Sequence, residues 1–301
     1  MTLFLYSYSN IFNMNTFFKK IKSFDYAVLF YCILTGIYIL FAYHKLQNIF
    51  FHLVIRILFI TITILLILTE NHKRTFLTFL RNFYPLLLLG FFYGETDYYN
   101  NLLFENFDPY LVKLESFIFG SQLSIIFSKL IYQRWFSEIM HFGYFSYYLF
   151  IILIPLLFYI KKNQHFEKSL FIIIFSFCAY YILFILFPSV GPQFYFTANQ
   201  TTVPDGFLFD KIMHLIVKFG ETKTGAFPSS HVGITIIFLI LIWKDFRNYF
   251  TILLMPATLL ILSTIYLKAH YAVDILGGIL SGFIFYAISL WIFNTRNKQK
   301  H

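Results

Sequence analysis

The chain has 301 residues, of which 59% are hydrophobic and only 12% are charged, and its mean hydropathy is +0.70. A soluble domain carries about 25% charged residues, and a single core in water cannot bury so much apolar surface. The composition therefore excludes an ordinary soluble protein. A net charge of +9 raises the question of nucleic acid, but the basic residues form short clusters between apolar runs, which is typical of membrane topology instead.

Apolar runs of about 20 residues are long enough to cross the hydrocarbon core of a bilayer as helices. The third run is interrupted by Arg81 and Pro85, and Arg56 lies within the second, where a charge needs a protein or water partner. The runs predict an all-α, polytopic membrane helical bundle. Its expected spans are 25–44, 51–69, 75–93, 137–160, 168–187, 229–243, 249–267 and 270–293.

The basic residues predict the orientation of these spans, because lysine and arginine collect in cytoplasmic loops. With the N-terminus in the cytoplasm, a basic cluster falls on the cytoplasmic side at every turn. These clusters contain Lys19, Lys20, Lys22, Lys73, Arg74, Lys161, Lys162, Lys168, Lys244, Arg247, Arg296, Lys298 and Lys300. We therefore expect both termini in the cytoplasm and the longer segments 94–136 and 188–228 on the extracytoplasmic face.

Segment 94–135 is too polar to cross a membrane easily. Its apolar residues recur every three or four positions between charges, which is typical of helices that lie along the membrane interface. Its acidic residues either contact a polar head group or a cation, or form the solvated face of such a helix, which is the simpler interpretation. They are Glu95, Asp97, Glu105, Asp108 and Glu115.

The first motif whose side chains could take part in a reaction is 225–231, Gly-Ala-Phe-Pro-Ser-Ser-His, which precedes an apolar run. Pro228 followed by Ser229 is a helix start signal, since proline suits the first turn and serine satisfies free backbone donors. A helix N-terminus offers free N–H groups and the positive end of the helix dipole, which favour an anion. His231, in the first turn with Ser230, would lie beside a phosphate bound there.

The second motif is 270–274, His-Tyr-Ala-Val-Asp, which also opens an apolar run. Residues four apart share one face of a helix, so Asp274 can accept a hydrogen bond from one ring nitrogen of His270. That bond would leave the lone pair of the other nitrogen available for attack. The carboxylate would also stabilise the cation that forms.

Each motif alone has an ordinary interpretation. A histidine near the end of a membrane helix is usually an interfacial residue, and the His-x-x-x-Asp spacing arises easily by chance. The two motifs, however, open different helices on the same predicted face, at matching depth. Their joint occurrence favours two histidines that converge on one phosphorus atom.

These motifs resemble those of the type-2 phosphatidic acid phosphatase superfamily, above all its inositol phosphorylceramide synthase-like branch. That superfamily has a basic stretch ending in Arg-Pro, then Pro-Ser-Gly-His, then Ser-Arg followed by His and Asp. The corresponding residues are Pro228, Ser229, Ser230 and His231, and then Ser263, Thr264, His270 and Asp274, while 187–193 matches the first motif loosely. The resemblance covers roughly 75–293, and FDPYLVKLESFIFG is similar to the segment before the core in the synthase-like branch.

The resemblance implies a six-helix phosphatidic acid phosphatase-like core. We expect an N-terminal tail with two transmembrane helices in 1–74, the catalytic core in 75–293 with segment 94–135 inside it, and a cytoplasmic basic tail in 294–301. The natural start is either Met1 or Met14.

The resemblance also implies roles for individual residues. His270 would be the nucleophile that forms a phosphohistidine, and Asp274 would orient it. His231 would protonate the leaving oxygen and then activate water or an alcohol. Ser229 and the backbone N–H groups of Ser230 and His231 would hold phosphate oxygens. No cofactor is implied; a zinc ion on His231, His270 and Asp274 is the alternative.

Two positions depart from the superfamily pattern: Thr264 and Gln193 stand where arginines are expected. A phosphoryl transition state carries negative charge that cations normally stabilise. Lys268 and Lys223 are the available substitutes, so the predicted phosphate site includes both of them and Gln193. Lys268 is equally well explained as an ordinary interfacial lysine. If neither lysine reaches the site, catalysis should be weak or absent.

The sequence thus predicts a membrane lipid phosphatase or phospho-head-group transferase, active at the extracytoplasmic face. Its partners would be a membrane lipid and, in the transferase case, a lipid alcohol such as a sphingolipid; nucleic acid is not expected. Water and alcohols use the same histidines, so the motifs do not separate hydrolysis from transfer. One alternative is a transporter, although there is no inverted repeat. The other is a catalytically silent member of the same fold, which the missing arginines favour.

Overall fold

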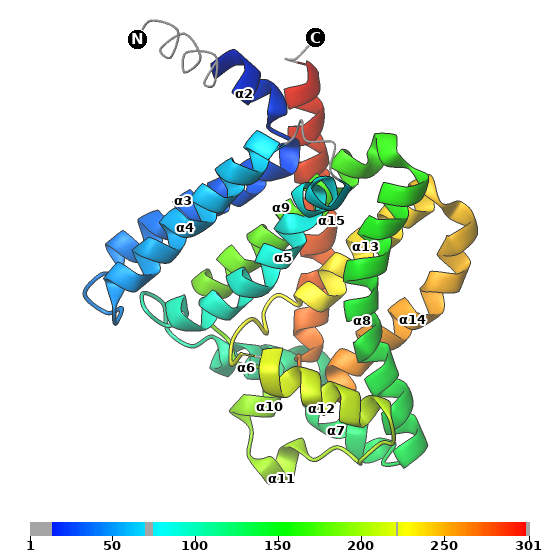
Figure 1. Ribbon diagram of the computed structural model, residues 1–301. Helices are drawn as coiled ribbons and strands as arrows, with labels where there is room; N and C mark the ends of the chain where they lie inside the picture. Colours follow the sequence, from blue (N-terminus) through cyan, green and yellow to red (C-terminus); the bar gives the residue numbers. More distant parts are fainter. Residues whose placement is uncertain (1–13, 70–74, 221, 299–301) are drawn as a thin grey trace, which may run out of the picture. The chain divides into compact units, whose positions relative to one another are not determined.

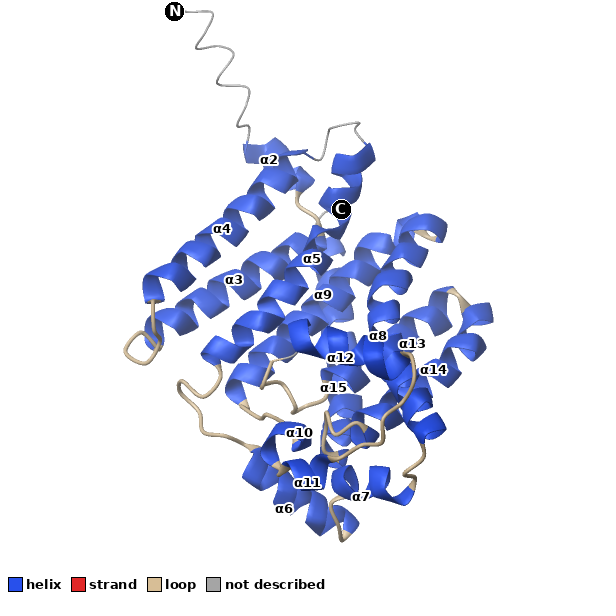
Figure 2. Ribbon diagram, turned by 60° about the horizontal axis from the view of Figure 1, so that its bottom comes forward, coloured by secondary structure: helices blue, strands red, loops and turns tan. Residues whose placement is uncertain are grey.

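The structure is a computed structural model that describes residues 14–69, 75–220 and 222–298. Every regular element in these ranges is a helix and none is a strand (Figures 1 and 2). The predicted all-α polytopic bundle is confirmed. Residues 1–13 with the alternative start at Met1, the basic pair Lys73 and Arg74, and the last three residues of the predicted tail lie outside the described residues.

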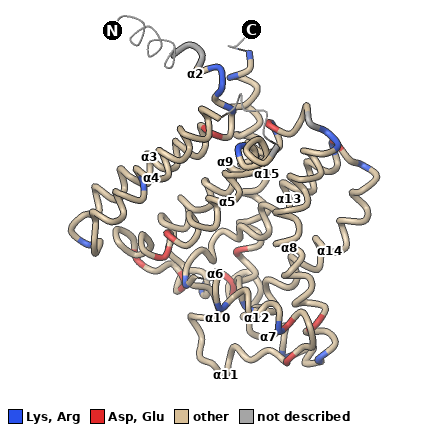
Figure 3. Tube along the Cα trace, in the orientation of Figure 1, with Lys and Arg blue, Asp and Glu red and all other residues tan. Residues whose placement is uncertain are grey.

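Seven of the described helices are long and apolar enough to cross a membrane. Most charged residues fall toward the ends of the long helices or in the segments that connect them (Figure 3). The seven helices are α3 (Ser23–Phe41), α4 (Ile49–Leu68), α5 (Thr75–Tyr99), α8 (Arg134–Lys161), α9 (Asn163–Leu186), α14 (Arg247–Tyr266) and α15 (Ala272–Lys298).

The span predicted at 229–243 is a helix, α13 (Ser230–Asp245), but it has only 16 residues. At 1.5 Å per residue such a helix is about 24 Å long, which is short against a hydrocarbon core of about 30 Å. By length alone, seven of the described helices are candidate spans, or eight if the bent pair Asp108–Phe119 and Leu123–Leu130 is one span, and the predicted span at α13 would cross only as a short helix. Because α13 packs against α8, α9, α14 and α15, it is enclosed by longer helices.

The chain divides into two compact units, Met1–Leu89 and Gly90–His301. The first contains α2 (Met14–Lys20), α3, α4 and the beginning of α5, and α3 packs along α4. The second contains the remaining helices and both histidine motifs.

The charges inside the first unit have partners. Arg81, which interrupts the third predicted span, donates hydrogen bonds of 2.8 and 2.6 Å to the two carboxylate oxygens of Asp25. The hydroxyl of Tyr84 donates to the same carboxylate at 2.6 Å. Arg56 lies over two aromatic rings, each 5.9 Å from its guanidinium carbon. These contacts supply what a charge in a membrane helix needs.

The polar segment that begins at residue 94 contains the end of α5 and two further helices. These are α6 (Asp108–Phe119) and α7 (Leu123–Leu130), which meet at a bend of 63° and together form either a broken span or a re-entrant loop. The second unit also contains three helices in the segment before the first histidine motif: α10 (Pro192–Tyr195), α11 (Ala198–Thr201) and α12 (Phe209–Gly220).

Two acidic residues of α6 are buried, although the sequence predicted that they would be exposed to solvent or to a head group. Asp108 and Glu115 are fully buried, so neither belongs to a solvated face nor reaches a head group. Asp108 accepts hydrogen bonds from the N–H groups of Val190 and Gly191 and from the hydroxyl of Tyr271, at 2.8 to 2.9 Å. Glu115 accepts from the backbone N–H groups of Ser124 and Ala272, both at 3.1 Å. These carboxylates tie α6 to α7, to the segment before α10 and to the start of α15, directly after His270.

Close packing brings the starts of α13 and α15 together. A Cβ added to Gly278 would lie 2.6 Å from the carbonyl oxygen of Ser229, and one added to Gly282 would lie 2.8 Å from the carbonyl oxygen of Gly233. Only glycine permits this approach of two helix backbones. As a result, the two motifs that open these helices are neighbours in space.

Candidate active site

The structure brings the two motif histidines into direct contact. His231 is the second residue of α13, and His270 lies two residues before α15. His231 Nδ1 is 3.1 Å from His270 Nε2, which is hydrogen-bonding distance. The rings meet nearly edge to face, with their centroids 5.2 Å apart. The imidazole at the start of α13 and the one just before α15 therefore face each other.

The surroundings of His270 define which nitrogen carries its proton. His270 Nδ1 lies 2.7 Å from the carbonyl oxygen of Ala226. Because a carbonyl oxygen only accepts hydrogen bonds, Nδ1 carries the hydrogen and Nε2 has the lone pair. His231 Nδ1 must then donate its own hydrogen to that lone pair. The nucleophilic nitrogen of His270 is thus directed toward His231.

Asp274 supports His270 less directly than its spacing suggests. Its Oδ2 atom is 3.5 Å from His270 Nδ1, while the same oxygen accepts the N–H of Tyr271 at 2.7 Å. The Ala226 carbonyl is therefore the closer partner that orients the ring. Asp274 is fully buried, and its Oδ1 has no hydrogen-bond partner in the described part of the chain. A carboxylate at this distance favours a positive charge on His270.

The start of α13 has the geometry expected for an anion site. Ser229 is the N-cap residue, and its hydroxyl oxygen accepts the N–H of Val232 at 3.3 Å. Ser229 is also fully buried, so its hydroxyl oxygen acts as the N-cap acceptor of α13. The N–H groups of Ser230 and His231 are in the first turn, where a helix provides no acceptor for them. They are the donors that a phosphate oxygen would meet.

A small cavity of about 20 Å³ reaches both histidines. Its polar lining side chains, apart from the histidines, are those of Tyr93, Tyr144, Gln193, Thr222 and Thr224. No lysine or arginine is among the described residues that line it.

Of the predicted phosphate-binding residues Gln193 and Lys268, only Gln193 lines the histidine cavity. Gln193 reaches the histidine cavity, and its N–H donates to the carbonyl of Lys268 at 3.0 Å. The Lys268 side chain is fully buried and points to α7, where Nζ donates to the carbonyl of Ser124 at 2.9 Å and to the hydroxyl of Ser128 at 2.8 Å. Burial, and to a lesser extent the charge of Lys129, lowers the pKa of Lys268 to about 8.

Lys223 is exposed, and its Nζ lies 5.7 Å from the centroid of the Phe194 ring. Its neighbours Thr222 and Thr224 line the histidine cavity, but Lys223 itself is not part of that lining. Thr264, at the position of the other expected arginine, is buried, and its hydroxyl donates to the carbonyl of Ile261 at 2.7 Å. The structure thus brings Gln193 to the histidines but neither lysine.

Several residues at the site had no signal in the sequence. The rings of Tyr144 and Tyr147 on α8 lie against His231, with centroid distances of 4.8 and 4.3 Å. Two tyrosines three positions apart share a helix face, but nothing distinguishes them among the 23 tyrosines of the chain. The role of the Ala226 carbonyl could not be predicted either, because every residue has a backbone carbonyl.

The profile of the PAP2 superfamily matches residues 109–288, which include both histidine motifs and most of the second unit. The chain belongs to the PAP2 superfamily. Neither curated proteins nor solved structures gave a match. PAP2 proteins are generally phosphatases or phosphotransferases, so membership makes this chain a membrane protein of phosphatase type. The match does not distinguish the inositol phosphorylceramide synthase-like branch.

The zinc alternative does not agree with the geometry of this PAP2 site. Asp274 faces Nδ1 of His270, whereas His231 faces Nε2, so the three side chains do not point at a common position. Among the described residues, no group of three or more histidines, cysteines and carboxylates has the arrangement of a metal site.

Proposed function

We propose that this PAP2 protein is an integral membrane enzyme that hydrolyses a lipid phosphate or transfers a phospho-head group to a lipid alcohol. The observation that carries the proposal is the contact between His231 Nδ1 and His270 Nε2, with the lone pair of His270 on the nitrogen that faces His231. A phosphorus atom placed between these rings meets a nucleophile on one side and a proton donor on the other.

The reaction would proceed in two displacements. In the first, the Nε2 lone pair of His270 forms a bond to phosphorus, the bond from phosphorus to the leaving oxygen breaks, and His231 gives that oxygen a proton. In the second, His231 takes a proton from water or an alcohol, whose oxygen bonds to phosphorus as the P–N bond breaks. His270 is restored, and the product is either free phosphate or a new phosphate ester.

Charge on the transferred group would be stabilised mainly by dipoles. The side chains of Gln193, Thr222 and Thr224 line the cavity together with His231, at the positive N-terminal end of α13. Since neither Lys268 nor Lys223 lines it, we expect slower turnover than in relatives with arginines at these positions. A catalytically silent protein is the second candidate, and it is favoured by the same lack of a lining cation.

The substrate is expected to be a lipid because the site belongs to a chain whose long helices are apolar enough to cross a bilayer. The positive-inside pattern supports cytoplasmic termini and an active site at the extracytoplasmic face. The resemblance to the inositol phosphorylceramide synthase-like branch favours transfer to a sphingolipid alcohol over simple hydrolysis.

The test is phosphate release or transfer by purified protein in detergent, with a chelator present. We expect turnover that vanadate inhibits, and an acid-labile phosphoprotein intermediate that His270→Ala abolishes. His165→Ala is the matched control, because His165 also contacts an aspartate, Asp245, but at the other end of α13. Full activity in His270→Ala would refute the nucleophile, and no turnover of any lipid by the unaltered protein would favour the silent alternative.

A further inference from the structure

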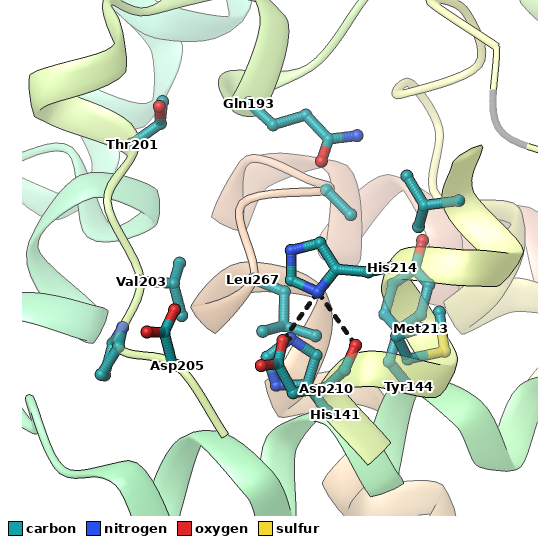
Figure 4. A pocket seen from close by; sticks show the side chains of 13 residues that line it. His141, Tyr144, Gln193, Thr201, Val203, Asp205, Asp210, Met213, His214 and Leu267 are labelled. Carbon is teal, nitrogen blue, oxygen red and sulfur yellow. Dashed lines mark hydrogen bonds and ion pairs between the residues drawn. The ribbon is translucent and has the colours of Figure 1, made fainter. Parts of the chain in front are cut away.

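A second, larger cavity lies next to the histidine cavity. It measures about 270 Å³, and its walls come from α8, α12 and the segments before α12 and α15 (Figure 4). Tyr144, Gln193 and Ala269 line both cavities, so the two share a wall. Tyr144 also lies against the ring of His231. The larger cavity is therefore adjacent to the proton donor of the proposed reaction.

The larger cavity contains a cluster of titratable side chains, shown in Figure 4. His214 Nδ1 is 2.9 Å from the backbone carbonyl oxygen of Asp210 and 2.8 Å from its Oδ1. The backbone carbonyl oxygen can only accept a hydrogen bond, so Nδ1 carries the hydrogen and His214 Nε2 has the lone pair. Nε2 has no partner among the described residues, and the His214 side chain is 74% exposed. An aspartate thus presents a histidine lone pair to the cavity.

Asp210 is held firmly in this position. Its Oδ2 accepts the N–H of Gly206 at 3.0 Å. The start of α12 is itself fastened to α8, because the carboxylate of Glu138 accepts the N–H groups of residues 207, 208 and 209 at 2.7 to 2.8 Å. The cluster is therefore preorganised.

The lining chemistry indicates what this cavity can bind. Besides the cluster it includes the carboxylate of Asp205, the amide of Gln193 and the hydroxyl of Thr201, and no lysine or arginine is among its described lining residues. Without a cation, and with two carboxylates, it disfavours a phosphate. Carboxylates and a histidine lone pair instead accept hydrogen bonds from hydroxyl groups.

We propose that the larger cavity binds the alcohol part of the substrate, a group with free hydroxyls, and that one of these hydroxyls donates a hydrogen bond to His214 Nε2. The location of the phosphate beside this alcohol rests on the proposed function. In two successive in-line displacements, the entering alcohol approaches from the side on which the first one left. That side is the one occupied by His231, and Tyr144 joins it to the larger cavity.

The proposal is tested by equilibrium binding to the His270→Ala protein, which cannot form the intermediate. The probes are detergent micelles that contain phosphatidylglycerol or phosphatidylmethanol, two phosphodiesters of equal charge, of which only the first has head-group hydroxyls. We expect phosphatidylglycerol to bind about threefold to tenfold more tightly, the worth of one net hydrogen bond. The further change His214→Ala should abolish this preference, and His214→Gln should keep part of it.

Leu215→Ala is the matched control, because Leu215 is exposed on α12 and does not line the cavity. Equal binding of the two lipids, or a preference that survives His214→Ala, would overturn the alcohol site. If free glycerol competes with phosphatidylglycerol, the occupant is a soluble alcohol. If free glycerol does not compete, the occupant is a lipid head group. If the preference is found but the unaltered protein turns over neither lipid, the alcohol site stands and the proposed catalysis fails.

Discussion

The contact between α13 and α15 makes a quantitative prediction about Gly278. The Cβ of alanine at this position would lie 2.6 Å from the carbonyl oxygen of Ser229, a backbone atom with no free rotation. An ordinary contact is longer by roughly an ångström, so Gly278→Ala must push the start of α15 away from α13. His270 and Asp274 precede or open α15, whereas His231 opens α13, so the displacement separates the two imidazoles.

A misplacement of about 1 Å between reacting groups costs on the order of 100-fold in rate. We therefore expect Gly278→Ala to lower kcat for lipid phosphate turnover about 100-fold. Overpacking should also cost about 1–3 kcal/mol of stability, measured by unfolding in detergent. The assay is steady-state turnover at saturating lipid, run at a temperature where the variant is folded.

The control for this prediction is Gly94→Ala. A Cβ at Gly94 meets no atom within 4 Å, so alanine should leave turnover unchanged and slightly favour the helix. If Gly278→Ala were folded and turned over lipid at the rate of the unaltered protein, the close contact would not be what aligns the histidines, and the reasoning would be wrong.

Two further predictions concern residues around the site. Asp108→Ala removes the acceptor of the Val190 and Gly191 N–H groups and of the Tyr271 hydroxyl, so unfolding in detergent should show a loss of about 3 kcal/mol, and an unchanged midpoint would contradict this role. Gln193→Arg places a cation in the wall of the histidine cavity and should raise kcat about tenfold or more if charge stabilisation limits turnover; no increase in a folded variant would count against that limit.

The apolar runs of the sequence predicted the helices well, because spanning a bilayer requires a length and a composition that local sequence shows directly. The exception was α13. Its apolar run is as hydrophobic as the others, but proline and serine before it and Asp245 at its end limit the helix to 16 residues. The pairing of His231 with His270 was likewise predictable, since each opens a helix on the same expected face.

The partners of charged side chains were not predictable. Asp108 and Glu115 have the spacing of a solvated helix face, yet their partners are backbone N–H groups more than eighty residues away for Asp108 and, at Ala272, over 150 away for Glu115. Lys268 lies two residues before His270, but its side chain turns to the carbonyls of α7. Local periodicity contains no information on such long-range contacts, and they decide which charges reach the site.

The hydrogen bond between the two imidazoles has a consequence for which molecules can react. The His270 lone pair accepts the hydrogen of His231 Nδ1 in this structure. A reagent that merely approaches therefore finds no available electron pair. The lone pair becomes available only when a molecule offers His231 another hydrogen-bond acceptor, as the bridging oxygen of a phosphate ester does. The resting site thereby discriminates against simple alkylating electrophiles before any bond to the nucleophile begins to form.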